Sequence, residues 1–503
     1  MPVPPGNPSG APEAPTTADE RALMDRVPKR LRIGSGWVVP DSGGLFSVAD
    51  PSTGVTLAEV ADATPEDGIA ALTAAHGAQA AWAATAPRER SDILVRAYQA
   101  VKARVDDLSL LITLEMGKPL ADSRWEVAYA ADFLRWYAEE AVRIEGRYLV
   151  SPSGTGRILT LQQPVGPALL ITPWNLPLAM VTRKIGAALA AGCTIILKPA
   201  EQTPLTALAL TEILLQAGIP DHGVINTLTT SSPGPLVAAL MTDRRLRKVS
   251  FTGSTEVGRA LIAQSASQVL RISLELGGNA PFIVFEDADL NQAADGAMLA
   301  KMRTNGEACT AANRFYVARR AAPKFIDLLA DRFRNIRVGR GTDLAVDAGP
   351  LIDASAQDRL DGLIADATSR GSHILVGGAR LDRPGYFYSP TLLTDVGPGS
   401  QLLDQELFGP IAPVCIFDNE SEVVAAANGT WYGLAAYLYT NDLNRALRVS
   451  ESLETGMVAL NQGTVANAAA PFGGIKHSGY GREGGQEGLQ DYLQTKYLAI
   501  GMD

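Results

Sequence analysis

Two stretches near the start of the chain carry apolar residues at three- and four-residue spacing, from about Asp67 to Gly117 and then up to Gly146. This period predicts amphipathic helices, and glycine suits a helix C-terminus because it tolerates left-handed backbone. The pattern then changes, because residues 156–166 alternate like a strand and the next apolar run stops at Pro173. The chain therefore passes from helices to strands near Gly146.

From about residue 177 to residue 267, short apolar runs alternate with helical stretches. Such alternation predicts a parallel sheet whose strands are joined by right-handed helical crossovers. This doubly wound arrangement usually binds a nucleotide cofactor at the carboxyl ends of its strands. The alternation continues to about Val458, which leaves enough chain for a second core. We therefore expect an α/β fold with more than one core.

The composition supports large cores and excludes several classes of protein. The chain has 503 residues, 46% of them hydrophobic, which rules out a disordered or fibrous protein and predicts two or three domains. With 54 acidic and 44 basic side chains, its net charge of −10 argues against nucleic-acid and anionic-membrane partners. The most apolar stretch, 165–181, is interrupted by prolines, so no membrane span is expected. Three cysteines are too few for a disulfide framework and favour a reducing, cytoplasmic location.

Candidate chemistry centres on Cys309. This residue lies in a polar, glycine-containing turn between an expected helix and an expected strand, where a thiol can face a cleft. On these residues alone, a nucleophile and an ordinary loop thiol both remain open. Cys193 and Cys415 lie in apolar stretches and are expected in the core. The four histidines are scattered and no metal-ligand spacing occurs, so no metal site is expected.

Two other positions could take part in catalysis or binding. Glu275 follows an apolar strand and precedes two glycines, a setting that can raise a carboxyl pKa and suit a general base. A solvent-exposed glutamate fits the same pattern. Gly253 and Ser254 stand between an expected strand and an expected helix, whose N-terminus can bind a pyrophosphate. A plain strand–helix junction is the alternative, because the motif is neither GxGxxG nor a Walker loop.

A series of short motifs connects these residues with a known family. In chain order they are ITPWN, LKPAEQTP, SFTGSTEVG, LELGGNAPF, NGEACTAANR, ELFGP and PFGGIKHSG. Together they resemble the aldehyde dehydrogenase superfamily over residues 30–500, and the segments GGNAPFIVFEDADL and DYLQTKYLAIG are most similar to succinate-semialdehyde dehydrogenases. The resemblance implies an aldehyde-dehydrogenase-like fold, with a Rossmann-type cofactor domain, an α/β catalytic domain and a small β oligomerisation extension.

The resemblance also implies roles in the oxidation of an aldehyde by NAD, with NADP as the alternative cofactor. Cys309 would be the nucleophile that forms a thiohemiacetal and then a thioester, Glu275 the general base, and Asn175 the oxyanion-hole amide. Glu201 would accept both ribose hydroxyls and repel a 2′-phosphate, which favours NAD. The implied cofactor-binding residues are Trp174, Lys198, Glu201, Gly253, Ser254, Leu276, Glu406 and Phe408.

The expected substrate carries a carboxylate at its far end. By resemblance to succinate-semialdehyde dehydrogenases, Arg183 and Arg303 hold this carboxylate, and Asn467 stands where relatives have a serine. Succinic semialdehyde is the first expectation, and glutaric semialdehyde or an uncharged aldehyde is the alternative. Glu275 argues against a CoA-acylating dehydrogenase. The catalytic residues Cys309, Glu275 and Asn175 together argue against a non-catalytic structural or binding protein on the same fold.

The chain is expected to comprise a disordered N-terminal tail, two large domains and an oligomerisation extension. The tail is rich in proline and glycine, and the rest follows from the resemblance. Pairing of the extension between subunits would give a homodimer or a homotetramer. The expected boundaries are 1–22 for the tail, 23–147 and 166–275 for the NAD-binding domain, 276–481 for the catalytic domain, and 148–165 and 482–503 for the oligomerisation segments.

Overall fold

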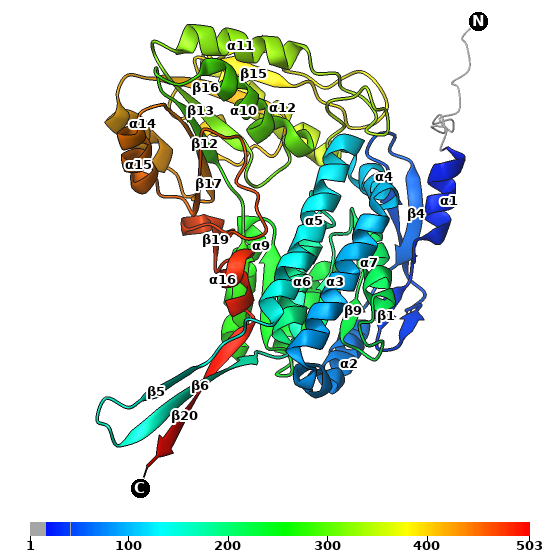
Figure 1. Cartoon of the computed structure of the whole chain (residues 1–503). Helices are drawn as coiled ribbons and strands as arrows, with labels where there is room; N and C mark the ends of the chain where they lie inside the picture. The colour runs from blue at the N-terminus through cyan, green and yellow to red at the C-terminus, as the bar shows by residue number, and fades with distance from the viewer. Residues whose placement is uncertain (1–16, 41, 503) are drawn as a thin grey trace, which may run out of the picture.

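A computed structural model describes residues 17–40 and 42–502 of the chain. Two bodies, each built on one large sheet with helices on both faces, lie one above the other, and a narrow β extension projects from the lower body (Figure 1). This architecture confirms the predicted α/β fold with two cores. No helix among the residues described here is long and apolar enough to cross a membrane.

The sheet of the lower body has the strand order β19-β11-β10-β7-β8-β9-β1-β2, and its central strands run parallel. Successive side chains of a strand face opposite sides. Leu169 and Leu170 of the central strand β7 therefore enter two different cores. The strands are β1 (Leu31–Ile33), β2 (Gly36–Val38), β7 (Ala168–Ile171), β8 (Ile195–Lys198), β9 (Ile225–Thr227), β10 (Lys248–Thr252), β11 (Arg271–Glu275) and β19 (Gly479–Tyr480).

Helices cover both faces of this sheet. The long helices predicted before Gly146 are present, and Gly117 ends one of them in the left-handed conformation, with φ 92°. One face is covered by α3 (Pro87–Ala103), α5 (Leu120–Ala141), α6 (Ala179–Ala191) and α7 (Pro204–Gln216), and the other mainly by α2 (Pro65–Ala84), α8 (Pro233–Thr242) and α9 (Thr255–Ser265). Helix α4 (Val105–Met116) packs beside α5, α7 and α1 (Ala18–Arg26).

The sheet of the upper body has the order β14-β15-β16-β13-β12-β17-β18. Phe282 lies at its centre and packs against Phe315 and Tyr439, with ring centroids 5.2 and 5.0 Å away. Its strands are β12 (Ala280–Val284), β13 (Ala312–Ala318), β14 (His373–Val376), β15 (Thr391–Thr394), β16 (Ile411–Phe417), β17 (Ala435–Tyr439) and β18 (Met457–Leu460). Its helices are α10 (Leu290–Met302), α11 (Ala322–Arg334), α12 (Ala354–Ser369), α13 (Gln401–Asp404), α14 (Glu420–Asn428) and α15 (Leu443–Ser452).

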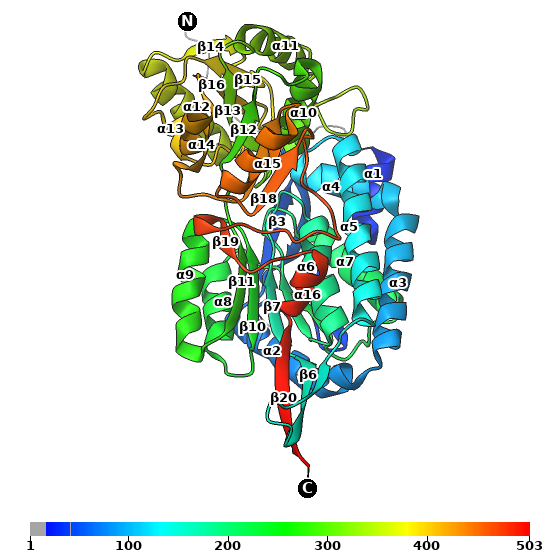
Figure 2. The same ribbon diagram turned by 60° about the vertical axis from the view of Figure 1, so that its left-hand side comes forward.

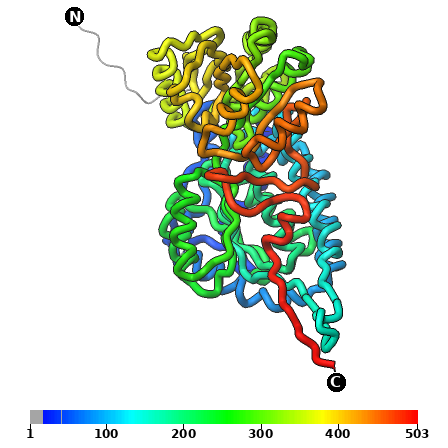
Figure 3. The backbone as a smooth tube through the Cα atoms, turned by 90° about the vertical axis from the view of Figure 1, so that its left-hand side faces the viewer, coloured from blue at the N-terminus to red at the C-terminus, as the bar shows by residue number. Residues whose placement is uncertain are grey.

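The projecting extension is a three-stranded antiparallel sheet of order β20-β6-β5. It consists of β5 (Arg147–Val150), β6 (Gly156–Pro164) and β20 (Leu493–Gly501), and the last two pair along their whole length. In Figure 2 the C-terminal segment runs from β19 through α16 (Gly485–Gln490) into β20. The C-terminal end projects well away from the body (Figure 3). The two segments predicted for oligomerisation thus form one sheet. Elsewhere in the chain, β3 (Leu45–Ala49) and β4 (Thr56–Ala61) form a separate antiparallel hairpin.

Two expectations from the sequence need correction. Residues 17–22 of the expected tail are not disordered, because α1 begins at Ala18 and a reciprocal pair of hydrogen bonds between Thr17 and Glu20 caps it. Residues 1–16 lie outside the described residues. Cys193 is buried as expected, but Cys415 is only half-buried, because it lies in an outer part of β16.

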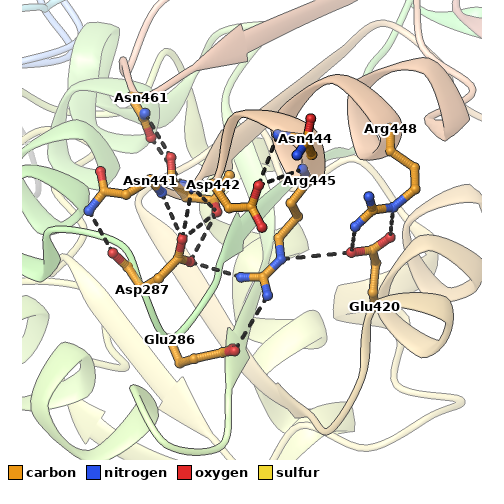
Figure 4. Close-up of polar contacts among 10 residues, drawn as sticks. Glu286, Asp287, Glu420, Asn441, Asp442, Asn444, Arg445, Arg448 and Asn461 are labelled. Atoms are coloured by element: carbon orange, nitrogen blue, oxygen red, sulfur yellow. Dashed lines mark hydrogen bonds and ion pairs between the residues drawn. The ribbon is translucent and has the colours of Figure 1, made fainter.

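A group of charged side chains, which we call the Arg445 cluster, joins three segments of the upper body (Figure 4). Arg445 pairs with Asp287 at 2.9 Å, Glu286 at 3.5 Å and Glu420 at 3.7 Å. Asp287 also accepts hydrogen bonds from the Thr440 hydroxyl and from backbone N–H groups of the same turn. The cluster therefore ties the end of β12 to α14 and α15.

Candidate active site

The two bodies meet at a cleft of about 370 Å³, here called the inner cleft. Cys309 reaches it from the turn after α10, and Asn175 reaches it from the turn after β7. Most of the residues implied for the cofactor line the same cleft: Trp174, Gly253, Ser254, Leu276, Glu406 and Phe408. The structure thus brings the expected nucleophile, the expected oxyanion-hole amide and six expected cofactor residues together.

Glu275 stands directly beside the thiol. Its Oε2 atom lies 3.8 Å from Sγ of Cys309, at the end of β11. Burial raises the pKa of Glu275 to about 7, although the nearby charge of Arg183 opposes this shift. Burial also raises the pKa of the Cys309 thiol well above its usual value, and the Glu275 carboxylate adds to this effect. A thiol that keeps its proton and a carboxylate that titrates near neutral pH form a suitable acid–base pair.

Hydrogen bonds to neighbouring residues hold Asn175 in place. Its Nδ2 atom donates to the carbonyl of Glu307 at 2.9 Å, and its buried Oδ1 atom has no hydrogen-bond partner in the described part of the chain. Lys118, itself fully buried, donates to the Asn175 carbonyl at 2.8 Å and pairs with Glu126. Glu126 in turn accepts the N–H of Leu178 at 2.8 Å, at the start of α6. Sequence reasoning missed this support, because Lys118 follows the end of α4 and Glu126 lies within α5, and neither belongs to a recognised motif.

The backbone before the nucleophile is strained. Thr304 and Asn305 both have φ 57°, and Gly306 has φ 78°, so successive residues adopt the left-handed conformation. Such a conformation costs about 1–3 kcal/mol for a residue other than glycine and needs support from its surroundings. Asp122 accepts the Thr304 N–H at 2.7 Å, and the Asn305 amide donates to the carbonyl of Pro350 at 2.8 Å. These contacts hold the turn that presents Cys309.

The nicotinamide end of the expected cofactor site is formed by two aromatic rings and a carboxylate. Trp174 and Phe408 pack edge to face, with centroids 5.3 Å apart. Glu406 accepts the N–H of Gly278 at 2.9 Å, and burial raises its pKa to about 7. Arg359 donates to the carbonyls of Glu406 and Phe408, at 3.1 and 3.2 Å, and lines the inner cleft. Sequence reasoning missed Arg359, since it lies in α12 outside every motif.

The residues expected at the pyrophosphate line the inner cleft, whereas those expected at the adenosine ribose do not. Ser254 caps α9 through the N–H of Val257 at 3.3 Å, so the N-terminus of this helix faces the inner cleft. A Cβ atom at Gly253 would lie 2.4 Å from the Phe251 ring, so only glycine fits this turn without displacement. Lys198 and Glu201, whose Nζ and Oε2 atoms are 3.4 Å apart, do not line the inner cleft. Glu201 lines a neighbouring cavity that borders it.

Arg183 was expected to face the substrate with a free guanidinium, but the structure buries it among carboxylates. Its side chain is fully buried, and it pairs through Nη2 with Glu275 at 3.3 Å and through Nε with Glu483 at 2.6 Å. Its guanidinium also lies 4.2 Å from the Phe472 ring. Lys184 pairs with the same Glu483. Glu483 was missed by sequence reasoning, although it follows the motif PFGGIKHSG by only a few residues.

Arg303 and Asn467 do not line the inner cleft. Arg303 donates to the Thr464 hydroxyl at 3.2 Å, and its guanidinium lies 4.3 Å from the Trp125 ring. Trp125 and the exposed Asn467 line a second cavity of about 500 Å³, here called the outer cavity. Asn467 therefore lines the outer cavity, whereas Arg303 does not line it and reaches it only through its contact with Trp125. Within the described residues there is no group of three His, Cys, Asp or Glu side chains able to hold a metal ion.

Comparison with known proteins identifies the family of the chain. Residues 37–498 match the model of the aldehyde dehydrogenase family. The chain is 55% identical to a succinate-semialdehyde dehydrogenase of Paenarthrobacter nicotinovorans, over 88% of this chain and 98% of the relative. It is 45% identical to the succinate-semialdehyde dehydrogenase [NADP(+)] of Escherichia coli (strain K12), over 93% and 97%.

A crystal structure of succinate-semialdehyde dehydrogenase from Burkholderia pseudomallei superposes with a TM-score of 0.93 at 45% identity, covering 96% of this chain and 99% of that one. The fold and the relatives define an NAD(P)-dependent oxidoreductase. The chain belongs to the aldehyde dehydrogenase family.

Proposed function

We propose that this protein is an NAD(P)-dependent dehydrogenase that oxidises a short ω-carboxylated aldehyde, succinic semialdehyde first, to the carboxylate. The observation that carries the proposal is the position of Cys309. Its thiol lies beside Glu275 and lines the inner cleft, while Arg303 lies toward the outer cavity. The names of the relatives from Paenarthrobacter nicotinovorans and Escherichia coli support the same substrate.

The chemistry follows from three side chains. Glu275 takes the thiol proton of Cys309, and the thiolate attacks the aldehyde carbon to give a thiohemiacetal. Negative charge grows on the former aldehyde oxygen, which the Asn175 amide and the Cys309 N–H stabilise; losing one such donor typically costs about 3 kcal/mol. Bound NAD(P) supplies the hydride acceptor. Glu275 releases the first proton to solvent, takes a proton from the water that hydrolyses the thioester, and returns it to the departing thiolate, which frees the acid and the thiol.

The residues around the inner cleft would hold the cofactor. Gly253, Ser254 and the N-terminus of α9 suit the pyrophosphate, since free N–H groups and the helix dipole favour an anion. Trp174, Leu276, Glu406 and Phe408 would surround the nicotinamide and its ribose, and Lys198 and Glu201 the adenosine ribose. The Glu201 carboxylate would repel a 2′-phosphate, so NAD is the preferred cofactor and NADP the alternative.

Two guanidinium groups and an amide would recognise the far carboxylate. Arg303 can turn its planar fork toward the substrate while it remains stacked on Trp125. Arg183 has fewer nitrogens available to the substrate carboxylate, because Glu275 and Glu483 already pair with two of them. Arg303 is therefore the main carboxylate ligand in this proposal, and Asn467 adds an amide donor. Glutaric semialdehyde, which is longer by one methylene, is the second candidate.

The assembly and the location belong to the same proposal. The lower body with 23–147 and 166–275 would be the NAD-binding domain, and 276–481 the catalytic domain, although β19 of that range joins the lower sheet. The exposed extension formed by 148–165 and 482–503 would pair with a second subunit, giving a homodimer or homotetramer in the cytoplasm. Light scattering at micromolar concentration should give a dimer or tetramer, and a monomer would contradict this part.

One panel of aldehydes tests the function. Purified protein is assayed with succinic semialdehyde, glutaric semialdehyde and butanal, each with NAD and with NADP, and with or without CoA. The expected result is NADH formation without CoA and the highest kcat/KM with succinic semialdehyde. NADH formation that requires CoA would identify an acylating enzyme, and no turnover of any aldehyde would identify a non-catalytic protein on this fold.

A further inference from the structure

Two buried hydrogen-bond donors near the proposed carboxylate site have no acceptor. The Tyr129 hydroxyl and Nη1 of Arg183 are both buried, and within the described residues neither has a hydrogen-bond partner. Leaving a buried donor unpaired costs about 1–3 kcal/mol, so native proteins rarely do so without reason. The Tyr129 oxygen can accept a hydrogen bond from Arg183, but the proton of the Tyr129 hydroxyl still needs an acceptor.

Aromatic packing links Tyr129 to Arg303. Tyr129 lies one turn after Trp125 on α5, and the two rings stack with centroids 5.2 Å apart. The guanidinium of Arg303 lies 4.3 Å from that same Trp125 ring. The Tyr129 ring also forms part of the wall of the outer cavity, together with Asn467, whereas its hydroxyl is directed into the protein. The hydroxyl therefore lies between the outer cavity and the buried charges.

The charges around this hydroxyl favour an anion. Burial raises the pKa of Tyr129, and the positive charges of Arg183 and Arg303 oppose that shift, so both guanidinium groups act on the phenol. The phenol consequently keeps its proton at neutral pH and can donate it in a hydrogen bond. Glu275 and Glu483 offset the charge of Arg183, so Arg303 supplies most of the positive charge. The neutral Tyr129 donor near it suits a carboxylate, which accepts several hydrogen bonds at once.

We propose that Tyr129 is a specificity-determining residue whose hydroxyl donates a third hydrogen bond to the far carboxylate of the substrate, beside Arg303 and Arg183. The inference rests on the proposed function. It also explains how the site can bind a carboxylate although Arg183 has only Nη1 free. An aldehyde that ends in a methyl group would leave the hydroxyl unpaired, so this residue selects against uncharged substrates.

The test is Tyr129→Phe, which removes the hydroxyl and keeps the ring against Trp125. The matched control is Tyr439→Phe, which removes another buried hydroxyl that lacks a partner in the described part of the chain, on β17. For succinic semialdehyde, kcat/KM of Tyr129→Phe should fall about tenfold to a hundredfold, the usual range for a hydrogen bond to a charged group. With butanal it should stay within about twofold, and the control should stay within about twofold on both aldehydes.

Other outcomes would overturn the inference. Equal losses on succinic semialdehyde and butanal would mean that the Tyr129 hydroxyl supports packing, and an unchanged kcat/KM for succinic semialdehyde would mean that it does not touch the carboxylate. Either Tyr129→Phe result overturns the inference alone, and leaves the proposed function standing, when wild-type enzyme prefers succinic semialdehyde and Arg303→Ala loses that preference. Wild-type enzyme without any preference overturns the proposed function, and the inference with it.

Discussion

The Arg445 cluster and the active site use the same types of side chain in opposite ways. In the Arg445 cluster each carboxylate faces a guanidinium, and Asp287 accepts further hydrogen bonds from Thr440 and the neighbouring backbone (Figure 4). Partial burial raises the pKa of Asp287, but the hydrogen bonds from Thr440 and Asn441 outweigh it and lower the pKa overall. This cluster is complete without a ligand, as expected of a structural contact.

In the active site the charged and polar groups remain incompletely paired. Burial raises the pKa of Glu275 to about 7. Buried atoms without a partner among the residues described include Oε1 of Glu275, Oδ1 of Asn175, Nη1 of Arg183 and the Tyr129 hydroxyl. Unpaired buried atoms also occur elsewhere in the described part of the chain, for example Nε of Arg340 and the Tyr439 hydroxyl, but none belongs to the Arg445 cluster, whereas the active site holds several.

The largest effect is expected from Cys309→Ala. Removing the thiol abolishes the covalent step, so kcat should fall by a factor of about 10³ or more. The inner cleft is otherwise intact, so NAD should still bind, which calorimetry can measure. Cys415→Ala, which alters a half-buried thiol on β16, is the matched control and should retain activity. Turnover of Cys309→Ala at the wild-type rate would exclude it as the nucleophile.

Glu275→Gln should reduce kcat/KM by about 10²–10⁴-fold, the usual contribution of a general base. Because the base must be deprotonated and its pKa is raised to about 7, wild-type kcat/KM should fall as the pH drops through about 7. The Glu275→Gln variant should lack this dependence. Asp287→Asn, which alters the Arg445 cluster, should keep the wild-type pH profile. A profile that is flat from pH 5 to pH 8 in wild-type enzyme would refute the assigned base.

Arg303→Ala and Arg445→Ala remove the same side chain from the two regions. Arg303→Ala should cost about 2–4 kcal/mol of transition-state binding for succinic semialdehyde and much less for butanal. Arg445→Ala should leave kcat/KM unchanged but lower the free energy of unfolding by about 1–2 kcal/mol, since ion pairs and its contact with Phe285 are lost. Equal losses on both aldehydes in Arg303→Ala would mean that this arginine supports the fold.

The smallest effect concerns the cofactor. Glu201→Ser removes a carboxylate that would repel a 2′-phosphate, so the ratio of kcat/KM for NADP to that for NAD should rise about tenfold. Lys198 then loses its 3.4 Å partner and can attract the phosphate. Steady-state rates with both cofactors measure the ratio. A wild-type preference for NADP would show that Glu201 does not select NAD.

Local sequence patterns were sufficient to predict some of the active-site residues but not others. Glu275 at a strand end and Cys309 in a polar turn could be singled out from their neighbours in the chain, and the resemblance to a family supplied Asn175. The capping pair Thr17 and Glu20 was overlooked, because the proline- and glycine-rich residues before it favoured a disordered tail, although a threonine with a glutamate three residues later is typical of a helix start.

Long-range partners could not be predicted in the same way. The pairing of Arg183 with Glu483 joins residues 300 positions apart, on elements whose contact depends on how the C-terminal segment crosses the lower sheet. Sequence reasoning therefore gave Arg183 a free guanidinium, whereas packing of the two elements buries it. Tyr129 was overlooked for the same reason, because an aromatic residue at helical spacing is typical of an ordinary core position.

Pre-steady-state NADH formation tests the central claim most directly. Wild-type enzyme saturated with NAD is mixed with limiting amounts of succinic semialdehyde or butanal, and the second-order rate constant of the first turnover is measured for each. We expect one NADH per aldehyde consumed and a rate constant at least roughly tenfold higher for succinic semialdehyde, because the guanidinium groups pair with its carboxylate. Equal rate constants for the two aldehydes, or no first turnover with either, would contradict the account.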